Sequence, residues 1–362
     1  GGTNIPAPEP TSIHNPASAG MGIGYYGPFP QDIVIPNLAG RPSRHVPGGA
    51  PPHPRAFKLQ IKWVGMQRFI GYIMIIVAIS CWGLIGPLGR FGLAEGVSSL
   101  EIAFWRAAFG GAFFIIQAAC TGLWRATSAQ HGAFVAFGVP GIALLFLTYQ
   151  VGVQYSGAAL TAVLNNTAPI WVAMWSFLFF KESMTLLKII SVVMAIAGAA
   201  LVCVSGGGLG GAPSFIGIGA GLMSGLCYSL HYPFGKKYLA NVSPVTLYMH
   251  ILPAGALCLL PFVDFAPKSG QVWLSLLALG FFSSWVAYRA FCEALKRLES
   301  TRVAIMAPLE PFVAAFFAYF WWGENFSTLG WVGAVLVVSA VILSIKRSES
   351  EIAETNCVRN AS

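Results

Sequence analysis

One carboxylate lies near the centre of a long apolar stretch, where it could bind a cation or exchange a proton. Glu310 stands between Leu309 and Pro311, within the apolar run 302–321. An ionised carboxylate at the centre of a bilayer costs about 3 kcal/mol or more unless it is paired or hydrated, so such a residue usually has a function. A structural salt bridge to Arg289 is the alternative interpretation.

Two other polar groups at membrane depth could contact a small polar molecule. Arg106, in the run 99–120, could anchor a substrate carboxylate. The alternatives for Arg106 are a structural ion pair or a guanidinium that reaches back to the membrane surface. Asn165 and Asn166, in the run 157–180, point roughly 100° apart on a helix, so one of them could face a cavity. A hydrogen bond to a neighbouring helix is the alternative for both amides.

Aromatic side chains gather at the same predicted depth. Tyr228 and Tyr232 share one helix face with His231, and Trp285 and Tyr288 have the same helical spacing. Rings of this kind form walls that suit aromatic groups or quaternary ammonium groups, and simple packing is the alternative. The candidates for such a wall are Trp82, Tyr149, Tyr228, Tyr232, Trp285 and Tyr288.

No set of residues indicates an enzyme. The only aspartates are Asp32 and Asp264, and the sequence lacks the HExxH, P-loop and GxSxG motifs. The seven cysteines are scattered, without the spacing of a zinc site or a disulfide framework. We therefore expect no catalytic residues, no metal and no cofactor. If the chain drives transport, an ion gradient or exchange must supply the energy.

The composition places the chain in a membrane. Hydrophobic residues make up 56% of the sequence, charged residues only 9%, and the mean hydropathy is +0.68. Soluble domains carry about 25% charged residues. The pI of 9.2 does not indicate nucleic-acid binding, because the basic residues are spread between the apolar runs instead of forming one patch.

Ten apolar runs of about 20 residues are each long enough to cross a hydrocarbon core of ~30 Å. Only helices satisfy their backbone hydrogen bonds alone in lipid, so we predict an all-α integral membrane protein with about ten transmembrane helices. The predicted helices cover 68–92, 99–120, 132–154, 157–180, 186–205, 214–238, 244–263, 271–295, 302–321 and 328–346.

The distribution of Lys and Arg predicts the orientation. With the N-terminus inside, the cytoplasmic segments hold most basic residues between the runs, including Lys181, Lys236 and Lys237. The external segments hold Arg90 and Lys268. By the positive-inside rule, both termini are cytoplasmic.

The same motif occurs twice. AISCWGLIGPLGRFGLAEGVSSL at 78–100 aligns without a gap with SGLCYSLHYPFGKKYLANVSPVT at 224–246, so that Trp82 matches Tyr228. Downstream, a proline precedes a glutamate by the same interval in both copies, Pro169 before Glu182 and Pro311 before Glu324. Five helices per copy is an odd number, so the two copies must be inserted in opposite orientations, as in many alternating-access transporters. Glu182 and Glu324 are expected to cap the helix that follows each of them.

These segments resemble the EamA domains of the drug/metabolite transporter superfamily. The resemblance is carried by ALTAVLNNTAPIWVAMWSFLFFKESMT and by VAIMAPLEPFVAAFFAYFWWGENFSTLGWVGAVLVV, with their Pro…Glu turns, and by Trp82-Gly83 and Arg106. It extends from about Met66 to Arg347 and implies the fold more strongly than the substrate. Known members export amino acids, take up choline, or move sugars and drugs. The second copy departs from the first at Tyr228-Ser229, so the two halves of a site need not be equivalent.

The sequence therefore predicts a secondary transporter of a small amphipathic metabolite, such as an amino acid, an amine or a drug-like compound, in the bacterial cytoplasmic membrane. Its expected partners are the substrate, the lipid bilayer and a coupling proton or ion. Uptake of a quaternary amine such as choline is one alternative, and a membrane-embedded enzyme or lipid-handling protein is another. The predicted parts are a disordered Pro/Gly-rich tail or leader at 1–65, repeats at 66–206 and 214–347, and a polar cytoplasmic tail at 348–362.

Overall fold

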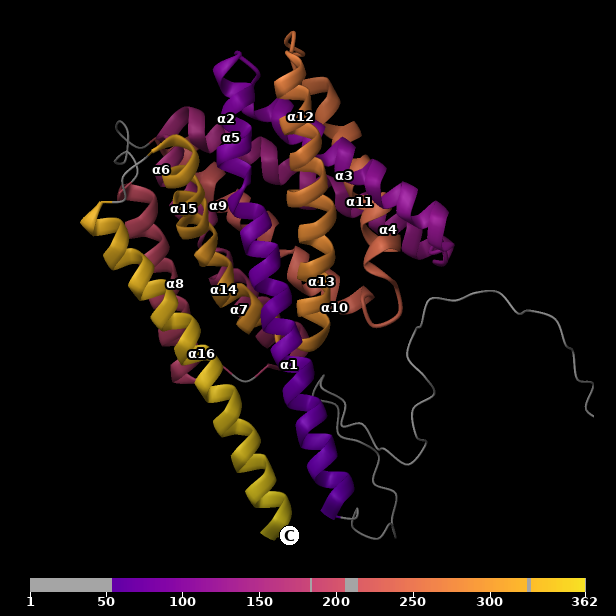
Figure 1. Cartoon of the computed structure of the whole chain (residues 1–362), viewed down its shortest axis with the longest axis vertical. Coiled ribbons are helices and arrows are strands. Elements are labelled where there is room, and N and C mark those ends of the chain that lie inside the picture. The colour runs from indigo at the N-terminus through magenta and orange to yellow at the C-terminus, as the bar shows by residue number, and fades with distance from the viewer. Residues whose placement is uncertain (1–53, 183, 206–213, 324–326, 362) are drawn as a thin grey trace, which may run out of the picture. The chain divides into compact units, whose positions relative to one another are not determined.

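The computed structural model describes residues 54–182, 184–205, 214–323 and 327–361, and every regular element in these ranges is helical (Figure 1). The α-helices are α1 (Pro54–Gly83), α2 (Ile85–Ala94), α3 (Ser99–Thr121), α4 (Ser128–Gly138), α5 (Leu145–Ser156), α6 (Ala158–Asn165), α7 (Ala168–Phe180), α8 (Leu186–Ser205), α9 (Phe215–Ser229), α10 (His231–Tyr238), α11 (Pro244–Leu259), α12 (Gly270–Leu279), α13 (Ala287–Arg297), α14 (Ser300–Met306), α15 (Glu310–Trp322) and α16 (Thr328–Ala361). Short π- or 3-10-helical segments are η1 (Val139–Leu144), η2 (Leu260–Phe262), η3 (Gly280–Val286) and η4 (Ala307–Leu309).

The predicted all-helical class is confirmed. In the described part of the chain, nine helical segments are long and apolar enough to cross a membrane. The tenth predicted span, 214–238, forms α9 and α10 but is not among these nine segments.

The two end helices are longer than predicted. Helix α1 begins at Pro54 instead of residue 68, because a proline suits the first turn of a helix and none follows it in the next 30 residues. Helix α16 continues to Ala361, past the predicted end at 346. The remainder of the predicted N-terminal tail, residues 1–53, lies outside the described residues, as does Glu324.

The two repeats run in opposite directions. In Figure 1 the chain rises from α1 to α2, whereas it descends from α9 to α10. The main helix contacts each join one helix from each repeat: α1 packs on α13, α3 on α11, α5 on α9, and α8 on α16. We name the two ends of the bundle by the predicted topology. The cytoplasmic end contains the start of α1, and the external end contains the α2–α3 connection.

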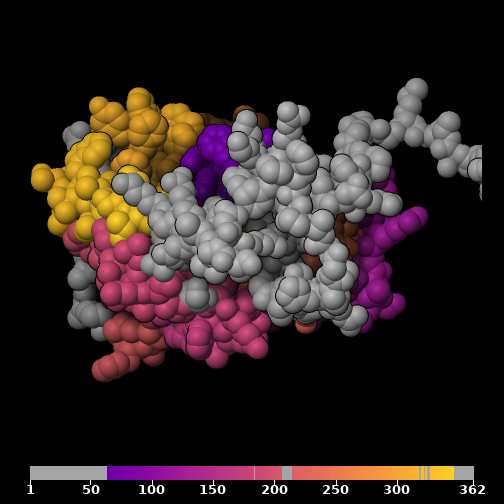
Figure 2. Space-filling model, turned by 90° about the horizontal axis from the view of Figure 1, so that it is seen from below, coloured from indigo at the N-terminus to yellow at the C-terminus, as the bar shows by residue number. Residues whose placement is uncertain are grey.

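The seam between α8 and α16 is especially close. A Cβ atom added to Gly198 would lie 2.6 Å from the carbonyl oxygen of Gly333, and one added to Gly333 would lie 2.6 Å from that of Gly198. The two backbones therefore touch, which only glycines permit. In the view from below, the rose-coloured α8 and the yellow α16 lie side by side (Figure 2).

Each repeat is interrupted at the same three places. Its first helix breaks at Leu84 or at Leu230, which the duplicated motif aligns. Its third helix contains a π-helix, η1 or η3. Its fourth helix breaks just before Pro169 or Pro311, because a proline cannot donate the backbone hydrogen bond that a continuous helix needs. Interrupted helices near the bilayer centre are where transporters bind their substrates.

Candidate substrate-binding site

Four of the predicted aromatic residues meet where the interrupted helices cross. The ring of Trp82, at the end of α1, lies 6.2 Å from the ring of Tyr228 in α9 and 6.0 Å from that of Tyr288 in α13, centroid to centroid. Tyr232 in α10 lies 6.0 Å from Tyr228. In each of these three pairs the rings meet edge to face, which is a preferred geometry of aromatic pairs. We call Trp82, Tyr228, Tyr232 and Tyr288 the aromatic cluster.

The π-helices fix the cluster through their carbonyl groups. The indole Nε1 of Trp82 donates to the carbonyl oxygen of Ser283 in η3, at 3.1 Å. The Nε2 of His231 lies 2.8 Å from the carbonyl oxygen of Gly141 in η1. Since a carbonyl only accepts, Nε2 carries the proton, and Nδ1 accepts from the Tyr248 hydroxyl at 3.1 Å. In each case a ring N–H from one repeat binds a π-helix carbonyl of the other.

Glu310 begins α15, directly after the 3-10 turn η4, and is half-buried. Its position in the first turn is favourable for a carboxylate, because the helix dipole is positive there. Among the described residues, its carboxylate has no hydrogen bond or ion pair, and it interacts electrostatically with Arg106, Tyr149 and Tyr228. The carboxylate is thus held near opposite charge without being bound by it.

The alternative of a Glu310–Arg289 salt bridge is wrong. The guanidinium of Arg289 lies over the ring of Trp285, 5.0 Å from its centroid. The basic group that interacts with Glu310 is Arg106. Helical spacing places Arg289 on the same face as Trp285, but it does not determine which neighbouring helix that face meets.

Arg106 projects from α3 toward the same region. Its guanidinium lies 4.5 Å from the centroid of Phe146, and it interacts electrostatically with Tyr288 and Glu310. Its backbone carbonyl accepts a hydrogen bond from Ser284 Oγ at 3.1 Å, which joins α3 to η3. Arg106 is half-buried, and its guanidinium forms no ion pair among the described residues.

Two hydroxyl groups of the cluster, those of Tyr228 and Tyr232, interact with each other. The Tyr228 and Tyr232 hydroxyl oxygens are buried, and neither has a hydrogen-bond partner of normal geometry among the described residues. A buried hydroxyl without a partner costs about 1–3 kcal/mol, so such groups usually serve a ligand or a water molecule.

The remaining candidates lie differently. Asn165 accepts a hydrogen bond from Ser224 Oγ at 3.2 Å, which joins α6 to α9, as the alternative interpretation expected. Trp285 donates to Gln117 Oε1 at 2.8 Å and packs with Phe113 and Phe281, so its ring contacts are separate from the aromatic cluster. Tyr149 in α5 is half-buried and within electrostatic reach of Glu310.

Reasoning from the sequence missed two contributors. Tyr248 in α11 stacks on Tyr288 with a centroid distance of 4.3 Å, and Phe291 in α13 lies 5.7 Å from Trp82. Phe291 stands three residues after Tyr288, a spacing that could have revealed it. No pattern in the sequence marks Tyr248.

The helices around this site are packed differently at the two ends. At the cytoplasmic end, α7 packs against α14, and α10 packs against α7, α13 and α14. At the external end, α2 packs against α15, but in the described part of the chain α6 and α15 make no comparable contact, nor does α2 with α5 or α6. The arrangement is closed toward the cytoplasmic end and looser toward the external end.

Comparisons with known proteins agree with this architecture. Residues 69–204 and 215–346 both match the EamA-like transporter family. An uncharacterized transporter of Archaeoglobus fulgidus is 22% identical over 285 residues, which cover 76% of this chain and 99% of the relative. The uncharacterized inner membrane transporter YicL of Salmonella typhimurium is 20% identical, over 75% of this chain and 94% of its own.

Two further similarities bear on function and fold. A probable terminal-alkyne amino-acid exporter of Streptantibioticus cattleyicolor is 25% identical over 282 residues, 76% of this chain and 93% of the exporter. A protein of known crystal structure superimposes with a TM-score of 0.66 at 17% identity, over 77% of this chain and 95% of the other. The structural likeness extends over nearly all of the described helices.

Proposed function

This chain belongs to the EamA-like transporter family, and from that premise we propose that it carries a small zwitterionic and amphipathic metabolite, such as an amino acid, by alternating access. It is a multi-pass membrane transporter and not an enzyme. We further propose that it resides in a bacterial cytoplasmic membrane. The inner membrane transporter of Salmonella typhimurium supports that location.

One observation carries the proposal: two opposite charges stand at the edge of one aromatic cluster. Arg106 and Glu310 interact electrostatically, yet neither forms an ion pair among the described residues. A free amino acid presents the complementary pair of charges. Its carboxylate would bind Arg106, its ammonium group would bind Glu310, and its side chain would contact the aromatic cluster.

The helix interruptions support transport by rocking of the two repeats. The breaks at Leu84, Leu230, Pro169 and Pro311 divide four helices into an external and a cytoplasmic half. Each half can tilt without disturbing the other, because no continuous hydrogen-bond ladder crosses the break. The substrate would bind at the breaks while one end opens and the other closes.

Relatives support the substrate class and Glu310 supports a coupling mode. The exporter of Streptantibioticus cattleyicolor acts on an amino acid by its name. A carboxylate without a fixed partner can exchange a proton for a cationic group. We therefore propose that protons compete with the substrate ammonium group for Glu310.

A second candidate substrate is a quaternary amine such as choline. The edges and faces of Trp82, Tyr228 and Tyr288 beside a carboxylate favour it, since aromatic rings bind quaternary ammonium groups. This substrate has no carboxylate and would not need Arg106.

Ligand-induced thermal stabilisation of the purified protein tests both substrates. Amino acids, amines, sugars and nucleosides are screened, and a true ligand raises the melting temperature by mass action. If an amino acid binds, Glu310→Gln and Arg106→Gln should each weaken binding by tenfold or more, which corresponds to about 1.4 kcal/mol or more.

The matched control is Arg289→Gln, which removes a guanidinium of the same kind from a position outside the aromatic cluster. It should leave the affinity unchanged. Binding of a quaternary amine that survives Arg106→Gln but not Glu310→Gln would favour the second candidate. If both variants retain wild-type affinity for every ligand found, the proposed site is wrong.

A further inference from the structure

We infer that Glu182 and Glu299 form a carboxylate latch that holds the cytoplasmic end closed and makes the externally open arrangement the resting state. The inference rests on the alternating access proposed above. It does not depend on which substrate is carried, because the latch lies at the cytoplasmic end of the bundle, apart from the aromatic cluster.

Glu182 crosses from one repeat to the other. It stands in the connection between α7 and α8, and its two carboxylate oxygens bind the start of α14 in the second repeat. Oε1 accepts from the backbone N–H of Ser300 at 3.2 Å, and Oε2 accepts from Thr301 Oγ1 at 2.9 Å. An acid at a helix N-terminus satisfies N–H groups that have no partner in the helix and faces the positive end of the dipole. The expectation that Glu182 caps α8 is therefore wrong, since the helix that it caps is α14.

The backbone before Glu182 is shaped for this contact. Lys181 has φ 52° and ψ 33°, and it is the one residue other than glycine with a positive φ in the described ranges. A side chain makes this left-handed conformation unfavourable, so it persists only where the surroundings enforce it. The turn is closed by a hydrogen bond from Glu182 N to Ser176 O at 3.2 Å. This left-handed residue ends α7, and the side chain of the next residue, Glu182, reaches α14.

Glu299 makes the second crossing, just before α14. Its Oε2 lies 3.0 Å from Lys188 Nζ in α8 and 2.8 Å from Arg302 Nε in α14. Both basic side chains are only 5% exposed. Arg302 also donates to the Ser344 carbonyl oxygen at 3.1 Å. One carboxylate thus ties together α8, α14 and α16.

A third basic residue, Lys236 in α10, makes contacts at the same cytoplasmic end. Lys236 Nζ donates to the carbonyl oxygens of Leu295 and Leu298, at 3.1 and 2.8 Å, where α13 ends. It also interacts electrostatically with Glu182 and Glu299. Cations at a helix C-terminus are stabilised by the dipole, so this contact fastens α10 to α13.

Charge keeps the latch engaged at neutral pH. Burial alone would raise the pKa of Glu299, but Arg302 and Lys188 outweigh burial and hold that pKa below its usual range. The charged groups that face Glu299 are Lys188 on α8, Arg302 on α14 and Lys236 on α10. All three are basic, and each favours the ionised carboxylate.

The external end lacks a counterpart of Glu299, whereas Glu324, the counterpart of Glu182, lies outside the described residues. A different contact joins the two repeats there, since Glu95 accepts from Ser269 N at 3.0 Å and from Ser269 Oγ at 2.6 Å. Counted back from Pro169 and Pro311, Gly157 and Ala158 occupy the places of Glu299 and Ser300. The N-terminus of α6 accordingly has no side-chain cap. Closing the external end would therefore not form a counterpart of the Glu299–Lys188 ion pair, which joins the start of α14 to α8. The described contacts therefore favour closure at the cytoplasmic end.

The test measures access from the cytoplasmic side without substrate. Ser176, 1% exposed in α7, is replaced by cysteine in a variant without native cysteines. Its reaction with an impermeant thiol reagent is timed in inside-out vesicles. Because each variant removes a charged acceptor that holds the closed end, Glu182→Ala and Glu299→Gln should each raise the labelling rate at least tenfold. Thr301→Val, which removes one donor, should raise it less.

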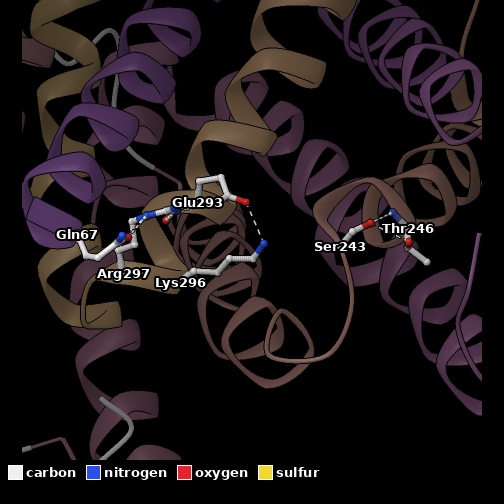
Figure 3. A network of polar contacts seen from close by, with 6 residues as sticks. All are labelled: Gln67, Ser243, Thr246, Glu293, Lys296 and Arg297. Carbon is white, nitrogen blue, oxygen red and sulfur yellow. Dashed lines mark hydrogen bonds and ion pairs between the residues drawn. The ribbon is translucent and has the colours of Figure 1, made fainter. Parts of the chain in front are cut away.

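The control is Glu293→Gln. Glu293 pairs with Lys296 and Arg297, which lie one turn further along α13 (Figure 3). It has the same charge and lies at the same end, and both of its ion pairs stay within α13. Arg297 also donates to Gln67 Oε1 in α1 at 3.0 Å, but Glu293→Gln leaves both of these groups in place, so labelling should stay at the parental rate. Melting temperatures identify variants that have merely unfolded.

If folded Glu182→Ala and Glu299→Gln were labelled at the wild-type rate, the inferred latch would be wrong. An equal acceleration by Glu293→Gln would also overturn it, since any loss of charge would then suffice. Fast labelling in the latch variants together with a failed ligand screen would leave the latch standing and would refute only the substrate class.

Discussion

Helices α3 and α11 are joined at both ends of the bundle, whereas the fourth helices of the two repeats are joined at one end only. Ser98 and Ser243 cap α3 and α11 in the same way, and the residues three positions later, Glu101 and Thr246, reach the opposite repeat. At the external end Glu101 accepts from Ala266 N at 3.1 Å and pairs with Lys268.

At the cytoplasmic end the corresponding contact is neutral. Thr246 Oγ1 donates to the Leu123 carbonyl oxygen at 2.7 Å, beside the Ser243 cap that Figure 3 shows. We call these two contacts straps: the charged strap of Glu101 with Lys268 and the neutral strap of Thr246 with Leu123. They lie at corresponding positions of the two repeats but differ in chemistry. Because the α3–α11 straps are formed at both ends in one conformation, they need not break when the two ends open and close in turn. The contact between α7 and α14 is formed at the cytoplasmic end only, so it is expected to break when that end opens.

The comparison divides the molecule into a scaffold and a gate. Helices α3 and α11, with the loops that they hold, form the scaffold. The cytoplasmic halves α7 and α14 and the external halves α6 and α15 form the gate. This division can be tested by fixing or breaking each strap.

The largest effect should come from cross-linking. Cysteines at 182 and 301, joined by a short cleavable bifunctional thiol reagent, would fix α14 to the first repeat and should abolish transport in proteoliposomes. Cleavage should restore it. Cysteines at 123 and 246 occupy a strap with an equally direct contact, and cross-linking there should leave transport within about twofold, since scaffold residues keep their neighbours. Loss of transport in both pairs would erase the distinction between scaffold and gate.

The next effect concerns the charged strap. The side chains of Lys268 and Glu101 are 4% and 0% exposed. The Lys268 ammonium also lies 5.1 Å from the ring centroid of Trp273. Removing one partner of a buried pair typically costs about 3–5 kcal/mol, because the other charge remains buried alone. We expect Lys268→Met to lower the stability in unfolding experiments by about that amount.

Removing both charges should recover most of the loss. The double variant Glu101→Gln with Lys268→Met leaves no isolated charge, and apolar replacements of buried pairs are often neutral. An unchanged melting temperature for Lys268→Met alone would show that this strap does not hold the scaffold.

The smallest effect is a pH dependence of the gate. The pKa of Glu299 is lowered in the folded protein from its ordinary value of 4.5. A lowered pKa means that the stabilisation is fully present above pH 4.5 and is lost as the pH falls through the folded pKa. Because the side chain is 37% exposed, screening limits the effect to about 1 kcal/mol or less.

The melting temperature of the wild type and of Glu299→Gln, measured from pH 7 to pH 3.5, checks this expectation. The two should differ at pH 7 and converge below pH 4.5. A difference that is constant across the range would show that Glu299 contributes by packing and not by charge.

The features that follow from local periodicity could be predicted from the sequence. The long apolar runs fix the helices, and the duplicated motif fixes the inverted repeats. Helical spacing also places Tyr228 and Tyr232 on one face, and both belong to the aromatic cluster. The prolines at 169 and 311 mark the breaks in the fourth helices.

The features that depend on which helices are neighbours could not be predicted from the sequence. Nothing in the spacing of Glu310 distinguishes Arg106 from Arg289 as its electrostatic partner. Glu182 was expected to cap the next helix in the chain, because a cap from another repeat leaves no local pattern. The π-helices likewise need one extra residue per turn, which side-chain periodicity does not reveal.

The contact of Gly198 with Gly333 limits how a substrate can arrive. Where two backbones touch, no gap remains that could admit an acyl chain or a membrane-dissolved molecule. Lateral entrance from the lipid between α8 and α16 is therefore blocked at the level of these glycines. Compounds that partition into the bilayer therefore gain no entrance through this seam between α8 and α16.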